Sequence, residues 1–288
     1  MEDKRDSAKG IGCNEAGKFL LPRSCLEAFR FLTAVPLPSA RRGSEDRLAS
    51  SVAWFPLVGG ALGGLLVIVD WASGRAFTHQ PSFLTSALLL LTYALFTGGL
   101  HHDGLLDTAD AFWGRRSREE RLRIMKDSRA GALGVTALIL FLLAELAVLY
   151  ALPAASSGTS GGLRQAALFS FPVLGRWSMS YLCLRFPYAR AEGTGAAMVG
   201  KALPRHFLIS TFLTLSALVF SFTWLVNIPM LIPVLILYTL ALAELLGGYF
   251  SRSLGGITGD VIGATGMLCE AFVLLLLASR VPLLLPGG

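Results

Sequence analysis

The sequence predicts an all-α integral membrane protein, a polytopic helical bundle of about seven transmembrane helices with its active site at the cytoplasmic face. Hydrophobic residues make up 53% of the chain, charged residues only 15%, and the mean hydropathy is +0.61. A soluble domain usually carries about 25% charged residues, so this composition argues against an ordinary soluble enzyme. We expect a flexible polar N-terminus at 1–24, followed by a single membrane-embedded catalytic domain at 25–288.

Several apolar stretches have the length of a membrane helix, which is about 17–25 residues. They lie at 51–71, 82–100, 131–154, 165–186, 207–226, 229–247 and 266–285. A shorter helical pattern from Cys25 to Pro36 predicts a helix at the membrane interface. Only Asn227 and Ile228 separate the fifth and sixth stretches, which predicts a tight helical hairpin with Pro229 in the first turn of the second helix.

The distribution of basic residues predicts the orientation of the chain. The N-terminal segment and the second and fourth loops are rich in arginine and lysine, and the sixth holds Arg252. The alternate loops hold only Arg75 and Arg164. Cytoplasmic loops carry the excess of positive charge in membrane proteins. We therefore expect a multi-pass protein of the cell (inner) membrane, with its N-terminus and active-site loops in the cytoplasm and its C-terminus outside. These loops also explain the net charge of +6 without a nucleic-acid partner.

A dense group of ionisable residues follows the second apolar stretch. On a helix, Asp103, Asp107 and Asp110 occupy positions i, i+4 and i+7 and fall within roughly 60° of one another. Like charges held so close repel one another, and a hard divalent cation such as Mg²⁺ or Mn²⁺ would hold them together. The group therefore predicts a metal site at the membrane surface. His101 and His102 point about 100° apart, so spacing alone does not decide which of them shares the aspartate face.

The loop that follows offers groups for binding phosphate. Ser117 predicts the start of a short helix, because Glu120 completes a capping box three residues later. Beyond that helix come Lys126, Asp127, Ser128 and Arg129. Two cations and a hydroxyl suit a phosphate, and arginine can bind two of its oxygens at once. A solvated loop is the simpler alternative, since basic residues are common beside membrane helices.

Two later loops add polar candidates. Asp260 lies among glycines at the mouth of the last span, where it would serve as a second metal ligand or as a base, with backbone N–H groups free to approach phosphate. In the loop 186–195, Arg190 and Tyr188 lie close to several glycines. That loop is either a plain linker or a substrate loop that stacks on a ring.

Several ionisable residues fall within predicted spans, among them Glu145, Arg176, Glu244 and Glu270. Such residues are costly in a membrane and usually face a bundle interior or a functional cavity. Arg176 and Glu270 are the stronger functional candidates. Glu145 and Glu244 could equally form an internal hydrogen-bonded pair.

Short blocks of sequence occur in one order along the chain. They are Phe31–Pro36, Phe55–Gly59, Gly98–Asp110, Ile124–Arg129, Pro187–Arg190 and Thr258–Ala264. Each block alone is modest, but the ordered set resembles the cobalamin-5′-phosphate synthase family, also called adenosylcobinamide-GDP ribazoletransferases. His102 departs from the apolar residue expected at its position in that family, so His101 is the family-like histidine.

The resemblance implies an Mg²⁺-dependent membrane phosphotransferase in a late step of cobalamin (vitamin B12) biosynthesis. Such an enzyme transfers the adenosylcobinamide phosphate of adenosylcobinamide-GDP to α-ribazole or α-ribazole 5′-phosphate. It releases GMP and forms adenosylcobalamin or its 5′-phosphate. The implied partners are these substrates and the lipid bilayer, with no nucleic acid; whether the chain forms a homo-oligomer stays open.

Mapped onto this chain, the hypothesis assigns residues to three roles. The Mg²⁺ ligands are Asp103, Asp107 and Asp110. The catalytic residues are Asp103, Asp107, Asp260 and His101. The substrate-binding residues are Lys126, Asp127, Ser128, Arg129, Arg176 and Arg190.

Two alternatives remain, one a related enzyme and the other a protein of another class. CDP-alcohol phosphotransferases share an Asp-rich signature, but their two Asp pairs with an Ala-Arg between them are absent here. A polytopic transporter would explain the charges within spans. Against it, the chain shows no internal repeat of the kind many transporters have, and its densest acidic run is predicted at the cytoplasmic face.

Overall fold

The computed structural model describes residues 23–37, 45–77, 83–152 and 161–279. Within these ranges all regular elements are helical, and one isolated parallel bridge joins Tyr188 to Ile257. The elements are α1 (Arg23–Leu32), α2 (Glu45–Ser51), η1 (Val52–Trp54), α3 (Phe55–Ala76), α4 (Phe83–Thr97), α5 (Leu100–Phe112), α6 (Arg118–Ile124), α7 (Ala132–Ala151), α8 (Gly161–Arg185), η3 (Thr194–Ala197), α9 (Pro204–Val219), η4 (Phe220–Leu225, a π-helix), α10 (Leu231–Leu254) and α11 (Gly259–Ala278). The predictions for residues 1–22 and for the end of the last span, 280–285, lie outside the described residues.

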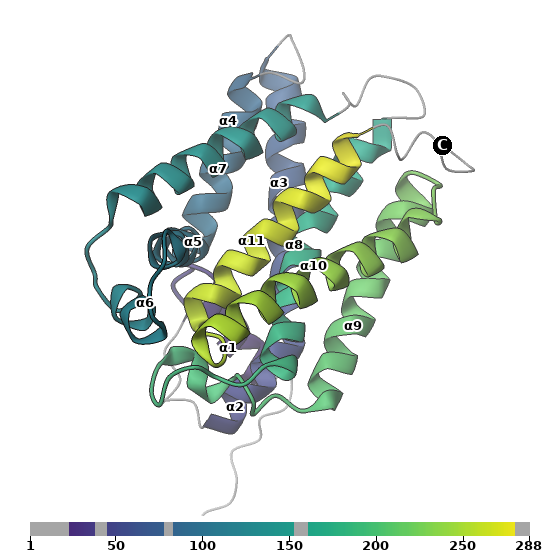
Figure 1. The fold of residues 1–288 in the computed structure, drawn as a ribbon. Helices are drawn as coiled ribbons and strands as arrows, with labels where there is room; N and C mark the ends of the chain where they lie inside the picture. The colour runs from purple at the N-terminus through teal and green to yellow at the C-terminus, as the bar shows by residue number, and fades with distance from the viewer. Residues whose placement is uncertain (1–22, 38–44, 78–82, 153–160, 280–288) are drawn as a thin grey trace, which may run out of the picture.

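The fold is a helical bundle with short helices at one end. Figure 1 shows α3, α4, α7, α8, α9, α10 and α11 forming its body, with α1, α2 and α6 gathered at the lower end. Among the described residues, five helices are long and apolar enough to cross a membrane, and α4 with α5 make a sixth if that bent pair is one span. This supports a multi-pass membrane protein, whereas the predicted count of seven is not confirmed. The remaining long helix is α8, which has 25 residues but carries Arg164, Arg176 and Arg185.

The outer faces of the bundle are apolar. Large side chains stay exposed along α4, α7, α9 and α10, among them Leu95, Leu140, Phe212 and Leu237. Soluble monomers rarely expose so much contiguous apolar surface. Such a surface suits contact with lipid acyl chains.

A corner interrupts the predicted span 82–100. Helix α4 ends at Thr97, and α5 leaves it at an angle of 92°. Gly98 and Gly99 form the corner with φ angles of 62° and 72°, a left-handed conformation that favours glycine. The prediction of one continuous helix is therefore wrong at its end. Instead α5 is a separate helix that packs against α11 and α7.

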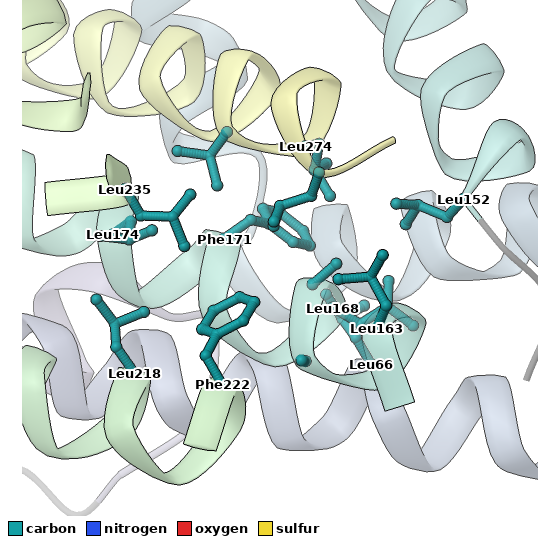
Figure 2. Close-up of a cluster of buried hydrophobic side chains, with 14 of the residues drawn as sticks. Leu66, Leu152, Leu163, Leu168, Phe171, Leu174, Leu218, Phe222, Leu235 and Leu274 are labelled. Atoms are coloured by element: carbon teal, nitrogen blue, oxygen red, sulfur yellow. The ribbon is translucent and has the colours of Figure 1, made fainter. Parts of the chain in front are cut away.

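The centre of the bundle is the pair α3 and α8. A Cβ atom at Gly59 would lie 2.8 Å from the Cα atom of Val173, and one at Gly63 would lie 2.8 Å from the Cα atom of Phe169. Glycines four residues apart let two membrane helices approach this closely. Around the pair, side chains from α3, α8, α9, α10 and α11 form the apolar core drawn in Figure 2. This packing fixes α8 inside the bundle, where its polar side chains meet those of α4 and α11.

The predicted hairpin is present with one difference. Helix α9 continues into η4, and α10 begins at Leu231. Asn227 makes the turn with a φ of 59°. Pro229 lies in this turn, two residues before α10, and not in the first turn of the helix as predicted.

Candidate functional site

A cavity of about 310 Å³ opens where α1, α5, α8 and α11 meet. Its polar lining includes Arg30, His101, Asp103 and Asp260. Asp103 is exposed and Asp260 is partly exposed, so the acidic side of the cavity is near the surface. The rest of the lining is largely apolar and mostly buried, and includes Leu32, Phe55, Met179, Cys183 and Met198. The cavity therefore combines a charged end with an apolar end.

A close approach between α5 and α11 brings the acidic residues of the site together. Asp103 and Asp107 lie one turn apart on α5, and Asp260 lies in the first turn of α11. Gly104 faces the start of α11, where a Cβ atom would lie 2.8 Å from the backbone oxygen of Asp260. A side chain at this position would force the two helices apart. Glycine here thus sets the separation of the carboxylates.

The three carboxylates share one electrostatic environment. Asp107 is half-buried, and the negative charges of Asp103 and Asp260 repel its carboxylate. The positive charge of Arg190 partly offsets this repulsion. Within the described residues, no three His, Cys, Asp or Glu side chains are arranged to hold a metal ion by themselves. Mg²⁺ usually takes one or two carboxylates together with substrate phosphates and water. The oxygen donors of Asp103 and Asp107 suit that mode of binding.

Asp110 adds a further negative charge near Asp107, but its carboxylate is bound to the start of α7. Its two carboxylate oxygens accept hydrogen bonds from the backbone N–H groups of Gly131 and Gly134, each at 2.7 Å. These N–H groups belong to the start of α7, which has no capping side chain of its own at Gly131. A carboxylate also suits the positive end of a helix dipole. Asp110 therefore fastens α5 to the start of α7, a role that its i+7 spacing did not reveal.

Arg190 bridges three segments around Asp260. Its Nη2 donates to Asp260 Oδ2 at 3.0 Å and to the Met125 carbonyl at 3.3 Å. The preceding residues are tied to α11, because Ala189 N–H donates to Ile257 O at 2.9 Å. Arg190 Nε is buried without a protein partner, so it is free to donate to a ligand.

Tyr188 belongs to the same loop, and its ring packs against the backbone of that loop. A Cβ atom at Gly195 would lie 2.8 Å from the Tyr188 ring. Burial is the main effect that raises the pKa of the Tyr188 hydroxyl, while the nearby Arg190 lowers it. The loop is thus a built part of the site rather than a plain linker.

The two neighbouring histidines have different surroundings. His101 lines the cavity, and its Nδ1 lies 3.4 Å from Nη2 of Arg176. His102 is not among the lining residues and packs edge-on against Tyr93, with ring centroids 5.7 Å apart. Arg176 is fully buried, so it contacts His101 and not the open cavity.

The predicted phosphate loop lies beside α6 and is exposed. Ser117 caps α6 as predicted, accepting a hydrogen bond from Glu120 N–H at 3.2 Å. Arg129 pairs with Asp127 at 2.7 Å, and this hydrogen-bonded pair lowers the pKa of the Asp127 carboxyl to about 2. Lys126 and Ser128 are exposed. None of these residues lines the cavity, although the loop ends at Gly131, which binds Asp110.

The two remaining acids within spans do not pair with each other. Glu244 accepts hydrogen bonds from Tyr181 at 2.5 Å and Arg185 at 3.0 Å. Glu145 is buried on α7 and interacts electrostatically with Glu270. The suggested Glu145–Glu244 pair is therefore wrong.

Sequence reasoning missed part of the cavity wall. Arg30 and Phe31 of α1 line it, and Phe31 stacks on Phe55 with ring centroids 6.2 Å apart. Both rings lie in blocks that carried the family resemblance, and that was the only available signal. Tyr93 was also missed, since a tyrosine in an apolar helix gives no sign of its polar partners.

Comparison with known proteins agrees with this picture over nearly the whole chain. The family model for cobalamin-5-phosphate synthase matches residues 24–278. The adenosylcobinamide-GDP ribazoletransferase of Roseiflexus sp. (strain RS-1) is 34% identical over 258 residues, covering 89% of this chain and 90% of the relative. The protein of the same name from Chlorobaculum tepidum is 38% identical over 253 residues, covering 87% and 93%. That from Desulforamulus reducens is 36% identical over 252 residues, covering 87% and 94%. No solved structure matches the chain.

Proposed function

We propose that this chain, which belongs to the cobalamin-5-phosphate synthase family, is an adenosylcobinamide-GDP ribazoletransferase. It would transfer adenosylcobinamide phosphate to α-ribazole or its 5′-phosphate and release GMP, in a late step of cobalamin synthesis. The observation that carries the proposal is the cavity that joins Asp103 and Asp260 to an apolar wall. The family match favours this function over a CDP-alcohol phosphotransferase or a transporter.

The reaction breaks the phosphoanhydride bond of the pyrophosphate and forms a phosphoester bond. A ribose hydroxyl oxygen of the ribazole attacks the phosphorus that carries adenosylcobinamide. The bond from that phosphorus to the oxygen of GMP breaks, GMP leaves with the electron pair, and the hydroxyl proton passes to a carboxylate. Asp260 suits this last role because its carboxylate lines the cavity and Arg190 holds its Oδ2 at 3.0 Å. Holding reacting groups in the right orientation can raise the reaction rate by several powers of ten.

Asp103 and Asp107 are the residues that would hold Mg²⁺. When bound, the ion would offset the charge of the pyrophosphate during transfer. The two side chains lie one helical turn apart at the acidic end of the site. Asp110 would keep α5 in register with α7 instead of contacting the ion.

Cations around the acidic group would bind the phosphates of the donor. Arg190 has a buried Nε without a protein partner beside Asp260. Arg30 lines the same cavity. Lys126, Ser128 and Arg129 lie on the neighbouring exposed loop, and Arg129 would first have to exchange Asp127 for phosphate.

The apolar end of the cavity would take the aromatic base of the ribazole. Phe31 and Phe55 provide a stacked aromatic wall, and Met179 lies beside them in the lining. Aromatic rings bury large apolar area and favour offset or edge contacts with other rings. The ribose would then point toward the carboxylates.

The protein would lie in the cell inner membrane with this site at the cytoplasmic face. The short, arginine-bearing helices α1 and α6 lie at the same end of the bundle (Figure 1). Cytoplasmic loops of membrane proteins are enriched in such residues. Nucleotide substrates are available on that side.

The test is a reconstituted assay in lipid nanodiscs with adenosylcobinamide-GDP, α-ribazole and Mg²⁺. We expect GMP and a cobalamin product in equal amounts. Asp103→Asn and Asp107→Asn should each lower the rate about 10–100-fold and raise the Mg²⁺ concentration required. Gly248→Ala serves as the matched control, because a Cβ atom there would meet nothing within 4 Å and Gly248 does not line the cavity. Near-normal GMP release by both Asn variants, correctly inserted, would contradict the assignment of these residues.

A further inference from the structure

A buried polar network connects the cavity to the interior of the bundle. It consists of Tyr93 on α4, His101 on α5, Arg176 on α8 and Glu270 on α11. Their relative exposures are 1%, 3%, 0% and 1%. Polar side chains are costly to bury, so these four residues from four helices need hydrogen bonds or ion pairs with one another. Of the four, only His101 lines the cavity.

The contacts within the network fix the position of Arg176. Its Nη1 donates to Glu270 Oε1 and, at 3.1 Å, to the Tyr93 hydroxyl. Tyr93 in turn donates to Glu270 Oε2 at 2.6 Å. Arginine and glutamate balance each other's charge, and the tyrosine holds both. The guanidinium therefore has a defined orientation, with its Nη2 directed at His101.

This orientation determines which nitrogen of His101 carries its proton. Arg176 Nη2 lies 3.4 Å from His101 Nδ1. A guanidinium has hydrogen-bond donors and no acceptor, so Nδ1 must supply the lone pair. In a neutral imidazole the proton is then on Nε2.

We propose that Arg176, held by Glu270 and Tyr93, is a positioning residue that occupies Nδ1 of His101 and so directs the Nε2–H of the ring to the cavity. His101 then presents a hydrogen-bond donor to the cavity and does not act as a base. Its ligand is an anionic phosphate oxygen, and this part of the proposal rests on the proposed function. A preorganised donor of this kind stabilises charge that develops on oxygen during transfer.

Spectroscopy tests the form of the ring without any substrate. The chain has four histidines, so ¹⁵N-histidine labelling gives few signals, and those of His101 are the ones lost in His101→Gln. We expect an unprotonated Nδ1 and a protonated Nε2. In Arg176→Gln/Glu270→Gln, which keeps the buried site neutral, the signals should shift toward a mixture of both tautomers. A protonated Nδ1 in the native protein, or unchanged signals in the double variant, would overturn the proposal.

Kinetics test the donor role separately. The side-chain amide of Gln can place an N–H near the position of Nε2, whereas that of Asn is too short. We therefore expect His101→Asn to lower kcat by about 10²-fold, and His101→Gln to lose clearly less, with little change in KM for α-ribazole in either variant. Equal, complete loss in both correctly folded variants would indicate a base and contradict the donor role. If the native protein releases no GMP while the ring form is as expected, the proposed function fails and the tautomer assignment stands.

Discussion

The close approach of α5 and α11 at Gly104 offers the sharpest test of how the site is built. In Gly104→Ala, the new Cβ atom would lie 2.8 Å from the Asp260 backbone oxygen and 3.1 Å from its Cα atom. Ordinary contact begins at 3.4 Å, so the helices must separate by about 0.6 Å. Both of these Asp260 atoms belong to the backbone, so no flexible side chain can move aside. Asp103 and Asp107 would move away from Asp260 by a similar amount.

The expected result is a loss of activity that exceeds the loss of stability. A misplacement of about 1 Å can cost about 10²-fold in rate, so a shift of this size should lower kcat by about 10-fold or more. Overpacking lowers the free energy of unfolding by about 1–3 kcal/mol, and the better helix propensity of alanine raises it by about 1 kcal/mol. The net change in unfolding free energy is therefore small.

The assay compares initial rates of GMP release with thermal unfolding in the same nanodiscs. Gly248→Ala is the matched control, since a Cβ atom at this helical glycine of α10 would meet nothing within 4 Å. We expect that control to keep native rates. If Gly104→Ala also keeps them, the separation of α5 and α11 does not set the geometry of the carboxylates, and the reasoning is refuted.

Three further substitutions separate the roles of individual residues. Asp110→Asn should lower the midpoint of thermal unfolding, because a lost helix cap costs about 0.5–2 kcal/mol of stability. The Mg²⁺ concentration required for activity should stay unchanged. A changed Mg²⁺ requirement would indicate that Asp110 is a metal ligand. Arg190→Met should raise KM for adenosylcobinamide-GDP and lower kcat. Arg190→Lys should recover only part of the native activity, because lysine lacks the planar guanidinium that binds two oxygens at once. Equal rates in the two variants would exclude an arginine-specific contact. Phe31→Ala should raise KM for α-ribazole about 2–10-fold, because an aromatic contact is lost, and leave KM for the donor unchanged. A raised KM for the donor with an unchanged KM for α-ribazole would place the donor against this wall.

Helical periodicity was enough to predict that the aspartate run is a helix, and the cost of buried charge was enough to single out Arg176 and Glu270. Periodicity could not show which partner each residue meets. Asp110 lies on the predicted face, but its partners are backbone N–H groups 21 and 24 residues further along the chain. The salt bridge between Arg176 and Glu270 joins residues 94 positions apart. Such pairs depend on which helices pack together.

The corner at Gly98 and Gly99 shows a second limit of the sequence. The apolar stretch continues to Leu100, so hydropathy predicted a span to that point. Backbone conformation ends the helix sooner, because both glycines take positive φ. Without that corner, α5 would continue along the bundle and its carboxylates would not face the start of α11. The break in the predicted span is thus what creates the acidic end of the cavity.

The two ends of the cavity also predict the order in which substrates bind. Phe55 and Met179 are buried, whereas Asp103 is exposed, so we expect a ligand to pass Asp103 on its way to the apolar wall. A cavity of about 310 Å³ accommodates a nucleoside, whereas a corrin macrocycle is far too large to enter it. A bound donor would therefore lie over the acidic end and block the way to the apolar end. We expect ordered binding with α-ribazole first.

Initial-rate and isotope-trapping kinetics check this order. Labelled α-ribazole, bound to the enzyme before dilution into unlabelled α-ribazole and donor, should be trapped as product in the first turnover. Enzyme first mixed with adenosylcobinamide-GDP should trap none of the labelled donor when diluted into α-ribazole with excess unlabelled donor. Efficient trapping of the donor would mean that both substrates reach their sites independently, and the expected passage past Asp103 to the apolar wall would then be wrong.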